Sequence, residues 1–354
     1  MTQQSKTGDA GFTVDTGPEL PVRRIGVLGC GRIGRMHAGL LAREVPGYVV
    51  AAVADAVPEA ALGVSSAIGA PVRTIEELLA SDDVDTVAIC TSTDTHVDLV
   101  IAAAAAGKAI FCEKPVSLDL EQVDRALAAV DAAGVPFMIG FNRRFDPGHK
   151  SVHDRVADGT IGDLHLLRIT SRDPAPPPPE YVAVSGGIFL DMVIHDFDMA
   201  GYVVRSPVSE VFARGAVRVD PRIGEAGDVD TAVTVLTHED GTLTTIDNSR
   251  EAVYGFDQRV EAFGSAGMAV SDNPARHAGW HVGRDARTDQ PLPWFFLDRY
   301  LESYRQEWAA FHTYLTEGGP SPVGTAEARH CTAVALAAGL SLREGRPVQV
   351  EEVG

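Results

Sequence analysis

The sequence predicts an α/β protein in two parts: an N-terminal, doubly wound parallel sheet, and a second α+β part built on an open, largely antiparallel sheet. Between residues 22 and 143, short apolar strands alternate with helical segments, the order of a parallel sheet whose strands are joined by helices. From residue 144 onward, predicted strands follow one another with Gly- or Asp-bearing turns, as in antiparallel sheets. A length of 354 residues and a hydrophobic content of 45% suffice for two cores of ordinary size.

Each element is predicted from a local pattern. Apolar runs predict the strands of the first part, at 24–28, 48–54, 85–90, 109–112 and 135–141. Helices are predicted after Gly34, at 96–106 and at 120–133. The strands predicted for the second part are 163–168, 208–219, 231–238, 243–248 and 258–263. The proline-rich run 173–179 excludes helix and central strand, so we expect an extended loop leading to a helix over 186–198.

Charge, cysteines and the N-terminus narrow the class of protein. A net charge of −19 argues against nucleic acid and anionic membrane as partners, because their phosphates would be repelled. No segment is apolar for long enough to cross a bilayer, and residues 1–21 are polar and unlike a secretory signal, so we expect a flexible arm there. The cysteines have no metal-ligand spacing and are expected to be buried thiols in a reducing cytoplasm: Cys30, Cys90, Cys112 and Cys331.

A G-x-G-x-x-G pattern, formed by Gly29, Gly31 and Gly34, lies between the first strand and its helix. Such glycines permit a tight turn and let the backbone approach a pyrophosphate at the helix N-terminus. The second strand ends in Asp55, where an acidic side chain accepts hydrogen bonds from the adenosine ribose and repels a 2'-phosphate. The pattern therefore predicts NAD in preference to NADP, the alternative being an ordinary strand-to-helix turn.

Asp191 and His195 are four residues apart in the predicted helix 186–198, so they would share one face. A carboxylate beside an imidazole favours the imidazolium and orients the ring, which suits a general base, and we therefore expect a raised pKa for His195. A satisfied structural contact is the alternative. A metal site of Asp191, His195 and Asp198 lacks any further His or Cys at ligand spacing, so no metal is expected.

The strand at Ala109 ends in Glu113-Lys114-Pro115. Together with the glycine pattern, the Asp191 helix and the segment 254–267, this motif resembles the glucose-fructose oxidoreductase/inositol dehydrogenase/MocA family from Arg24 onward. Residues 171–177, 185–191 and 294–300 are similar to the inositol 2-dehydrogenase branch in particular. The resemblance implies an NAD-binding Rossmann domain at 22–143 and a substrate-binding and oligomerisation domain at 144–354, often in a tetramer.

The family's site residues carry over to matching positions of this chain. His195 falls on the proton acceptor, Asp191 on the carboxylate that stabilises it, and Lys114 on the lysine beside the substrate hydroxyl, before a peptide bond that is commonly cis. The implied substrate-binding residues are Lys114, Arg143, Asp191, His195 and Tyr254. The implied cofactor-binding residues are Gly29, Gly31, Arg32, Ile33, Gly34, Asp55, Thr91, Thr93, His96, Glu113 and Lys114.

Some of these residues have a second interpretation. Arg143 can be part of a solvated arginine pair at a strand end, and Tyr254 a turn tyrosine. His96 can flank the cofactor, or the segment can instead be a helix cap made by Asp94 or Thr95.

The implied activity is NAD-dependent oxidation of a ring hydroxyl of a cyclitol to a ketone, with myo-inositol and scyllo-inosose as the first expectation. Met192 stands where some relatives carry a hydroxyl residue, which leaves the polyol open. A dehydrogenase of another sugar or amino-cyclitol is the alternative within enzymes. A non-catalytic NAD-sensing regulator of the same fold is the alternative of another class, although such a protein could lose the lysine and histidine that this chain keeps.

Overall fold

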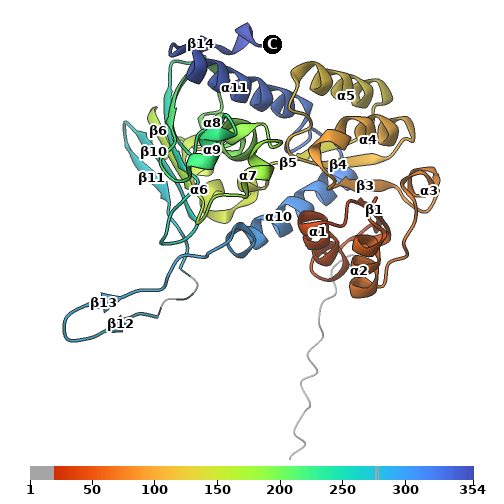
Figure 1. Ribbon diagram of the computed structural model, residues 1–354. Helices are drawn as coiled ribbons and strands as arrows, with labels where there is room; N and C mark the ends of the chain where they lie inside the picture. The colour runs from red at the N-terminus through yellow and green to blue at the C-terminus, as the bar shows by residue number, and fades with distance from the viewer. Residues whose placement is uncertain (1–19, 276, 278) are drawn as a thin grey trace, which may run out of the picture.

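The computed structural model describes residues 20–275, 277 and 279–354. The arm expected at residues 1–21 therefore lies almost wholly outside the described residues. Figure 1 shows two sheets side by side, each with helices packed on it, and the last two long helices running between them.

The first sheet has five parallel strands in the order β2-β1-β3-β4-β5. Its strands are β1 (Arg23–Leu28), β2 (Tyr48–Ala54), β3 (Thr86–Ile89), β4 (Ala109–Glu113) and β5 (Phe137–Gly140). Its helices are α1 (Arg32–Arg43), α2 (Pro58–Ile68), α3 (Ile75–Ala80), α4 (Thr93–Ala105) and α5 (Leu120–Ala133). The predicted parallel, doubly wound sheet is confirmed. Helices α2 and α3 were not predicted, although α2 begins with a proline and α3 with a capping box of Thr74 and Glu77.

The second sheet has seven strands in the order β11-β10-β6-β9-β8-β7-β14. They are β6 (Leu164–Arg172), β7 (Val208–Ala216), β8 (Thr231–His238), β9 (Leu243–Ser249), β10 (Asp257–Gly264), β11 (Gly267–Ser271) and β14 (Val348–Gln349). Within the described chain only β6 and β9 pair in parallel, so the sheet is largely antiparallel as expected. Helices α6 (Pro147–Ala157), α8 (Ile194–Val204) and α11 (Thr325–Glu344) contact it.

Helix α10 (Phe296–Glu317) packs into the core of the first sheet, although it follows the second sheet in the chain. Trp308 on this helix is fully buried, with its ring 4.3 Å from that of Phe111 on β4. The Tyr48 hydroxyl on β2 donates to the Trp308 carbonyl at 3.1 Å. We expected all of 144–354 to form one second domain and did not predict that α10 packs on the first sheet. Aromatic side chains that are buried against residues so distant in sequence leave no local pattern.

The helix expected over 186–198 is interrupted. A short helix, α7 (Pro179–Val182), ends the proline-rich run, and a π-helical turn, η2 (Phe189–Val193), precedes α8. Gly186 and Gly187 enter this turn with φ of 81° and 79°, values that favour glycine. Single π-turns inside helices occur often at functional sites.

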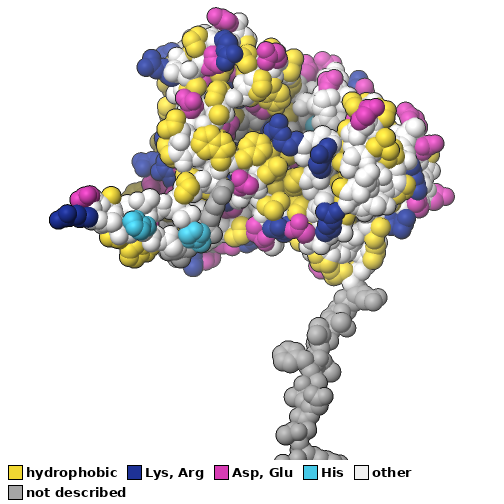
Figure 2. Space-filling model, turned by 60° about the horizontal axis from the view of Figure 1, so that its bottom comes forward, with side chains coloured by type: hydrophobic (Ala, Val, Ile, Leu, Met, Phe, Trp, Pro, Cys, Tyr) yellow, Lys and Arg dark blue, Asp and Glu magenta, His cyan; other side chains and the backbone are white. Residues whose placement is uncertain are grey.

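The remaining elements are η1 (Asn142–Phe145), α9 (Pro221–Glu225), η3 (Val350–Glu352) and a hairpin of β12 (His281–Val282) and β13 (Arg287–Thr288). Figure 2 shows this hairpin standing out from the body of the molecule, with Arg and His side chains on it. None of the helices in the described ranges combines the length and the hydropathy needed to span a bilayer.

Candidate functional site

The glycine loop between β1 and α1 is shaped by two close approaches. Gly29 has a φ of 91°, and a Cβ there would lie 2.5 Å from the Cys90 carbonyl oxygen. A Cβ on Gly34 would lie 1.8 Å from the Gly29 carbonyl oxygen. A Cβ on Gly31, in contrast, would meet no described atom within 4 Å, so this glycine leaves open space over the helix.

Helix α1 begins over this open space without a side-chain cap from any described residue. Its first backbone N–H groups, including those of Arg32 and Ile33, can therefore bind an anion. Arg32 is exposed, with its guanidinium 5.4 Å from the ring of Phe295. The loop fits the pyrophosphate of a dinucleotide.

Asp55 lies at the end of β2 with its carboxylate facing the glycine loop. Its Oδ2 accepts from the backbone N–H of Cys30 at 2.5 Å, and its Oδ1 accepts from that of Val57 at 2.7 Å. Two backbone donors thus hold an acidic side chain beside the pyrophosphate loop, where the adenosine ribose of NAD is expected.

Thr91 lies in the loop after β3, and Thr93 and His96 lie in the first turn of α4. The His96 ring is buried, with Nδ1 2.9 Å from the Pro115 carbonyl and Nε2 3.2 Å from that of Thr91. Burial lowers the pKa of His96. Both ring nitrogens therefore lie against backbone carbonyl oxygens, and the expected position of His96 beside the cofactor stays a prediction.

The other interpretation of this segment, a helix cap made by Asp94 or Thr95, is not found among the described residues. Ser92 is the N-cap residue of α4, and the described residues show no side-chain cap there. The Thr95 hydroxyl donates to the Ser92 carbonyl at 2.8 Å and to the Thr91 hydroxyl at 2.6 Å.

Lys114 follows β4, and its bond to Pro115 is cis, as the resemblance implied. The Lys114 Nζ donates to the backbone carbonyl of Asp191, in the π-turn, at 2.7 Å. This contact spans 77 residues of sequence and joins the two parts of the molecule. The Lys114 ammonium group therefore lies against the segment that carries His195.

The Glu113 carboxylate connects the backbone of Lys114 to helix α1. The carboxylate accepts from the Lys114 backbone N–H at 3.2 Å and contacts His37 Nε2 at 2.8 Å. Trp308 Nε1 donates to His37 Nδ1 at 2.8 Å, so Nε2 is the nitrogen of neutral His37 that carries the proton. A chain of hydrogen bonds thus connects α10 and the cofactor helix α1 to the lysine.

His195 is half-buried at the start of α8. Its Nδ1 is enclosed and has no hydrogen-bond partner among the described residues, which leaves Nε2 as the nitrogen that can reach a ligand. Burial, and then the charges of Lys114 and Arg143, hold the pKa of His195 well below its usual value. The expected rise of this pKa through Asp191 is therefore wrong, yet the neutral ring is the form that a base requires.

Asp191 binds other partners than His195. Its Oδ1 accepts from the Tyr181 hydroxyl at 2.9 Å, and its Oδ2 from Arg250 Nη1 at 3.1 Å. No hydrogen bond joins Asp191 to His195 in the described structure. Each carboxylate oxygen of Asp191 is instead taken by another partner, one by Tyr181 and the other by Arg250.

Arg143, in η1, is buried and paired. Its Nη1 donates to Asp196 Oδ1 at 2.5 Å and to the Ser171 hydroxyl at 3.3 Å. It is therefore not part of a solvated pair, and its charge acts on His195. A direct contact with substrate stays a prediction.

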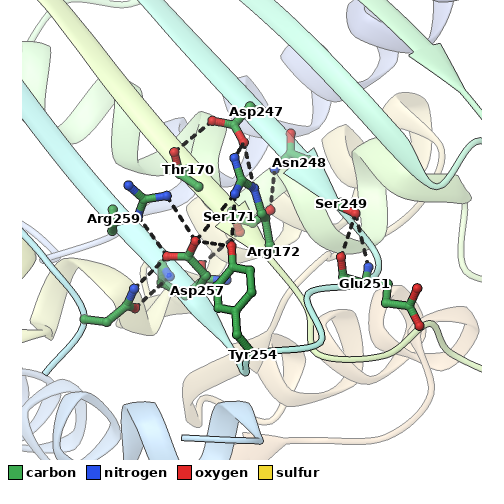
Figure 3. Close-up of polar contacts among 12 residues, drawn as sticks. Thr170, Ser171, Arg172, Asp247, Asn248, Ser249, Glu251, Tyr254, Asp257 and Arg259 are labelled. Atoms are coloured by element: carbon green, nitrogen blue, oxygen red, sulfur yellow. Dashed lines mark hydrogen bonds and ion pairs between the residues drawn. The ribbon is translucent and has the colours of Figure 1, made fainter. Parts of the chain in front are cut away.

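Tyr254 lies in a separate network, drawn in Figure 3. Its hydroxyl accepts from Arg172 Nη1 at 3.0 Å and donates to Asp257 Oδ2 at 2.8 Å. Within the described residues, the hydroxyl makes no hydrogen bond to Lys114 or to the Asp191 segment. Its expected contact with substrate stays a prediction.

Asp173, which sequence reasoning did not select, lies among the same charged groups. Burial raises its pKa to about 6, and Arg143 and Arg250 partly offset the rise, while Asp191 adds to it. The only signal in the sequence is a carboxylate directly after β6 and before a proline run. Tyr181 and Arg250, the partners of Asp191, were missed for the same reason: no motif marks them.

Asp173 leads to a pH prediction. If the ionised carboxylate accepts a substrate hydroxyl, kcat/KM for the substrate should fall as the pH drops through about 6, where Asp173 becomes protonated. Asp173→Asn should remove this limb and lower kcat/KM above it by about tenfold. The measurement is a pH profile of both proteins, and an unchanged limb in the variant would assign it to another group.

A metal centre finds no support in the described ranges, where no three His, Cys, Asp or Glu side chains come together as ligands. The four cysteines are free and buried. Burial raises the pKa of Cys30 to about 11. Such thiols are inert packing groups.

Comparisons with known proteins agree with this geometry. Residues 23–141 match the oxidoreductase family with an NAD-binding Rossmann fold, and residues 149–270 match the GFO/IDH/MocA C-terminal domain. The chain is 47% identical to a myo-inositol 2-dehydrogenase of Thermotoga maritima over 336 residues, 93% of this chain and 99% of the relative.

Solved structures are similar over the same length. A putative myo-inositol dehydrogenase from Sinorhizobium meliloti aligns with a TM-score of 0.91 at 42% identity, over 93% of this chain and all of that one. A scyllo-inositol dehydrogenase from Lactobacillus casei, with bound NAD(H) and scyllo-inositol, aligns with a TM-score of 0.87 at 26% identity, over 93% of this chain and 99% of that one. NAD is accordingly the cofactor that the glycine loop and Asp55 fit. The chain belongs to the GFO/IDH/MocA family of NAD-binding oxidoreductases.

Proposed function

We propose that the protein oxidises a ring hydroxyl of a cyclitol to a ketone with NAD, and that myo-inositol, giving scyllo-inosose, is its substrate. One observation carries the proposal: the Lys114 ammonium is bound to the segment that carries Asp191 and His195. A cation and a neutral imidazole thus lie beside each other at the cofactor domain. The names of the relatives supply the substrate class.

In the proposed mechanism, His195 Nε2 takes the proton of the hydroxyl that reacts. The Lys114 ammonium donates to the same oxygen and stabilises the charge that develops on it. NAD, held by the glycine loop and Asp55, would supply the acceptor for the hydride of the carbinol carbon. From the sequence we expected Asp191 to stabilise the imidazolium directly. In the proposed mechanism Asp191 instead accepts a hydrogen bond from a further ring hydroxyl.

The charged groups near the site favour a substrate without a net charge. Lys114, Arg143 and Arg250 bring three positive charges near the site; Arg143 is paired with Asp196 and Arg250 with Asp191, while Lys114 donates to a backbone carbonyl. A neutral polyol needs no further counter-charge in such a site, whereas an amino-cyclitol would bring an ammonium group near Lys114. This favours inositol over the amino-cyclitol alternative.

A panel of substrates tests the proposal. NADH formation is measured by absorbance with inositol isomers, glucose, xylose and inosamines. Turnover of myo-inositol with the highest kcat/KM is expected. If the protein binds NAD and oxidises none of these compounds, the dehydrogenase proposal is wrong and the NAD-sensing regulator is favoured.

A second test concerns the cofactor. Asp55 should favour NAD over NADP by at least about tenfold in kcat/KM, because its carboxylate accepts from the ribose diol and repels a 2'-phosphate. Asp55→Ser combined with Ala56→Arg should shift the preference toward NADP. Equal use of the two cofactors by the unmodified protein would contradict this assignment.

We also propose a cytoplasmic homotetramer. The outer face of the second sheet exposes large apolar side chains, Val233, Leu243, Phe263, Met268 and Val270, which an association of copies would cover. Buried free thiols are compatible with a reducing compartment. Mass measurement in solution tests the tetramer, and a monomer at micromolar concentration would contradict it.

A further inference from the structure

Arg250 is a fully buried guanidinium beside the carboxylate of Asp191. It follows β9, its side chain is 1% exposed, and its backbone N–H donates to the Asp230 carbonyl at 2.8 Å. Its Nη1 donates to Asp191 Oδ2 at 3.1 Å, and its Nη2 to Asp228 Oδ2 at 3.4 Å. A buried arginine is retained only with such carboxylate partners, because an unpaired charge in the interior is costly.

The two partners of Asp191 differ in how firmly they can hold it. Arg250 is charged, planar and enclosed, so its hydrogen bond to Oδ2 is charge-assisted and cannot be replaced by water. Tyr181, which donates to Oδ1, lies on the short helix α7 and is 48% exposed. Tyr181 can therefore give way to a ligand hydroxyl, whereas Arg250 cannot.

Asp228 connects Arg250 to the π-turn itself. Its Oδ1 accepts from the backbone N–H of Ile188 at 3.1 Å, just before η2 begins. A Cβ on Gly187 would lie 3.0 Å from the same oxygen, so the glycine permits this approach. The Asp228–Arg250 pair thus supports both the backbone entry to the turn and the carboxylate within it.

We propose that Arg250 is a positioning residue that holds Asp191 turned away from His195 and toward the substrate hydroxyls. The proposal rests on the proposed function and adds a residue to it. It explains why two side chains on one segment act on different atoms: His195 remains free for the reacting hydroxyl, while Asp191 accepts from another. Asp228 supports Arg250 in this arrangement.

Arg250→Met is the direct test. It is expected to lower kcat/KM for the polyol by about 30-fold or more, mostly through a higher KM, because Asp191 loses its fixed orientation. The NAD dissociation constant should stay within about twofold, since the contacts of Arg250 among the described residues do not reach the glycine loop. Arg250→Lys keeps the charge and can reach one carboxylate, so it should recover at least about fivefold over Arg250→Met.

Tyr181→Phe is the matched control, because it removes a hydrogen bond to the same carboxylate but no charge. Its loss should be smaller than about fivefold. Arg250→Met with Asp228→Asn removes one buried charge of each sign, which protects folding against the unpaired carboxylate. This double variant should fold, as judged by thermal unfolding, and keep the high KM.

The outcomes separate positioning from a merely structural role. Wild-type kcat/KM in folded Arg250→Met, or its return in the double variant, would overturn the proposal. An Arg250→Lys protein as poor as Arg250→Met, with NAD binding lost to the same degree, would do so as well. Calorimetric titration of myo-inositol into the protein with NADH measures binding without turnover; a wild type that neither binds nor oxidises any cyclitol contradicts the proposed function itself.

Discussion

Lys114→Met is expected to lower kcat for cyclitol oxidation by roughly 10² to 10⁴. The Lys114 ammonium lies against the segment that carries His195, where its Nζ donates to the Asp191 carbonyl. Without it, the oxygen that loses its proton has no positive donor beside it. Stopped-flow measurement of NADH formation in a single turnover would show whether the loss falls on the chemical step.

Lys108→Met is the matched control for this variant. The Lys108 Nζ also donates to backbone carbonyls, those of Ser81 and Val84, both at 2.7 Å, and it is 8% exposed. Its replacement should lower the thermal stability without a comparable loss of kcat. Equal losses of kcat in the two variants would mean that Lys114 acts through stability alone.

His195→Ala is expected to lower kcat by roughly 10² to 10⁴ while NAD affinity stays within a few fold. The variant removes the proton acceptor and leaves the glycine loop and Asp55 unchanged. His238→Ala is a suitable control, because His238 is also buried but binds the Ser206 carbonyl and the Thr244 hydroxyl on the second sheet. A His195→Ala protein with normal kcat would show that another residue takes the proton.

The pH profile gives a second readout for His195. Burial and the charges of Lys114 and Arg143 hold its pKa well below the ordinary value, so the ring is neutral at neutral pH. As a base it should therefore be ready at neutral pH, and kcat/KM should stay level there and fall only under acidic conditions. In Asp173→Asn, the acid limb that remains should belong to His195, whose pKa is held well below its usual value. A limb that rises through neutral pH would instead indicate an imidazole stabilised by a carboxylate, the arrangement that we expected from the sequence.

The cofactor side of the site could be predicted from sequence because its residues lie on short, local patterns. Gly29, Gly31 and Gly34 occupy one turn between a strand and a helix, and the close approaches at Gly29 and Gly34 involve the loop itself and Cys90, directly after the neighbouring strand β3. Asp55 ends a buried strand, so its place at the edge of a parallel sheet follows from strand order alone.

The substrate side could be predicted only in part. The resemblance named Lys114, Asp191 and His195, and the structure brings all three to one region. It did not indicate that Asp191 would bind Tyr181 and Arg250, because the contact with Arg250 spans 59 residues between a π-turn and the end of a strand.

By itself, the sequence determined the two-part α/β architecture, the dinucleotide loop and the choice of NAD, since strand, turn and helix preferences are properties of neighbouring residues. Tertiary structure alone decided the direction of the His195 pKa, the partners of Asp191 and the return of α10 to the first core. Each of these depends on which charges and apolar surfaces meet across the fold. A charge such as that of Arg143 acts on His195 through space, and its burial removes the solvent that would otherwise screen it.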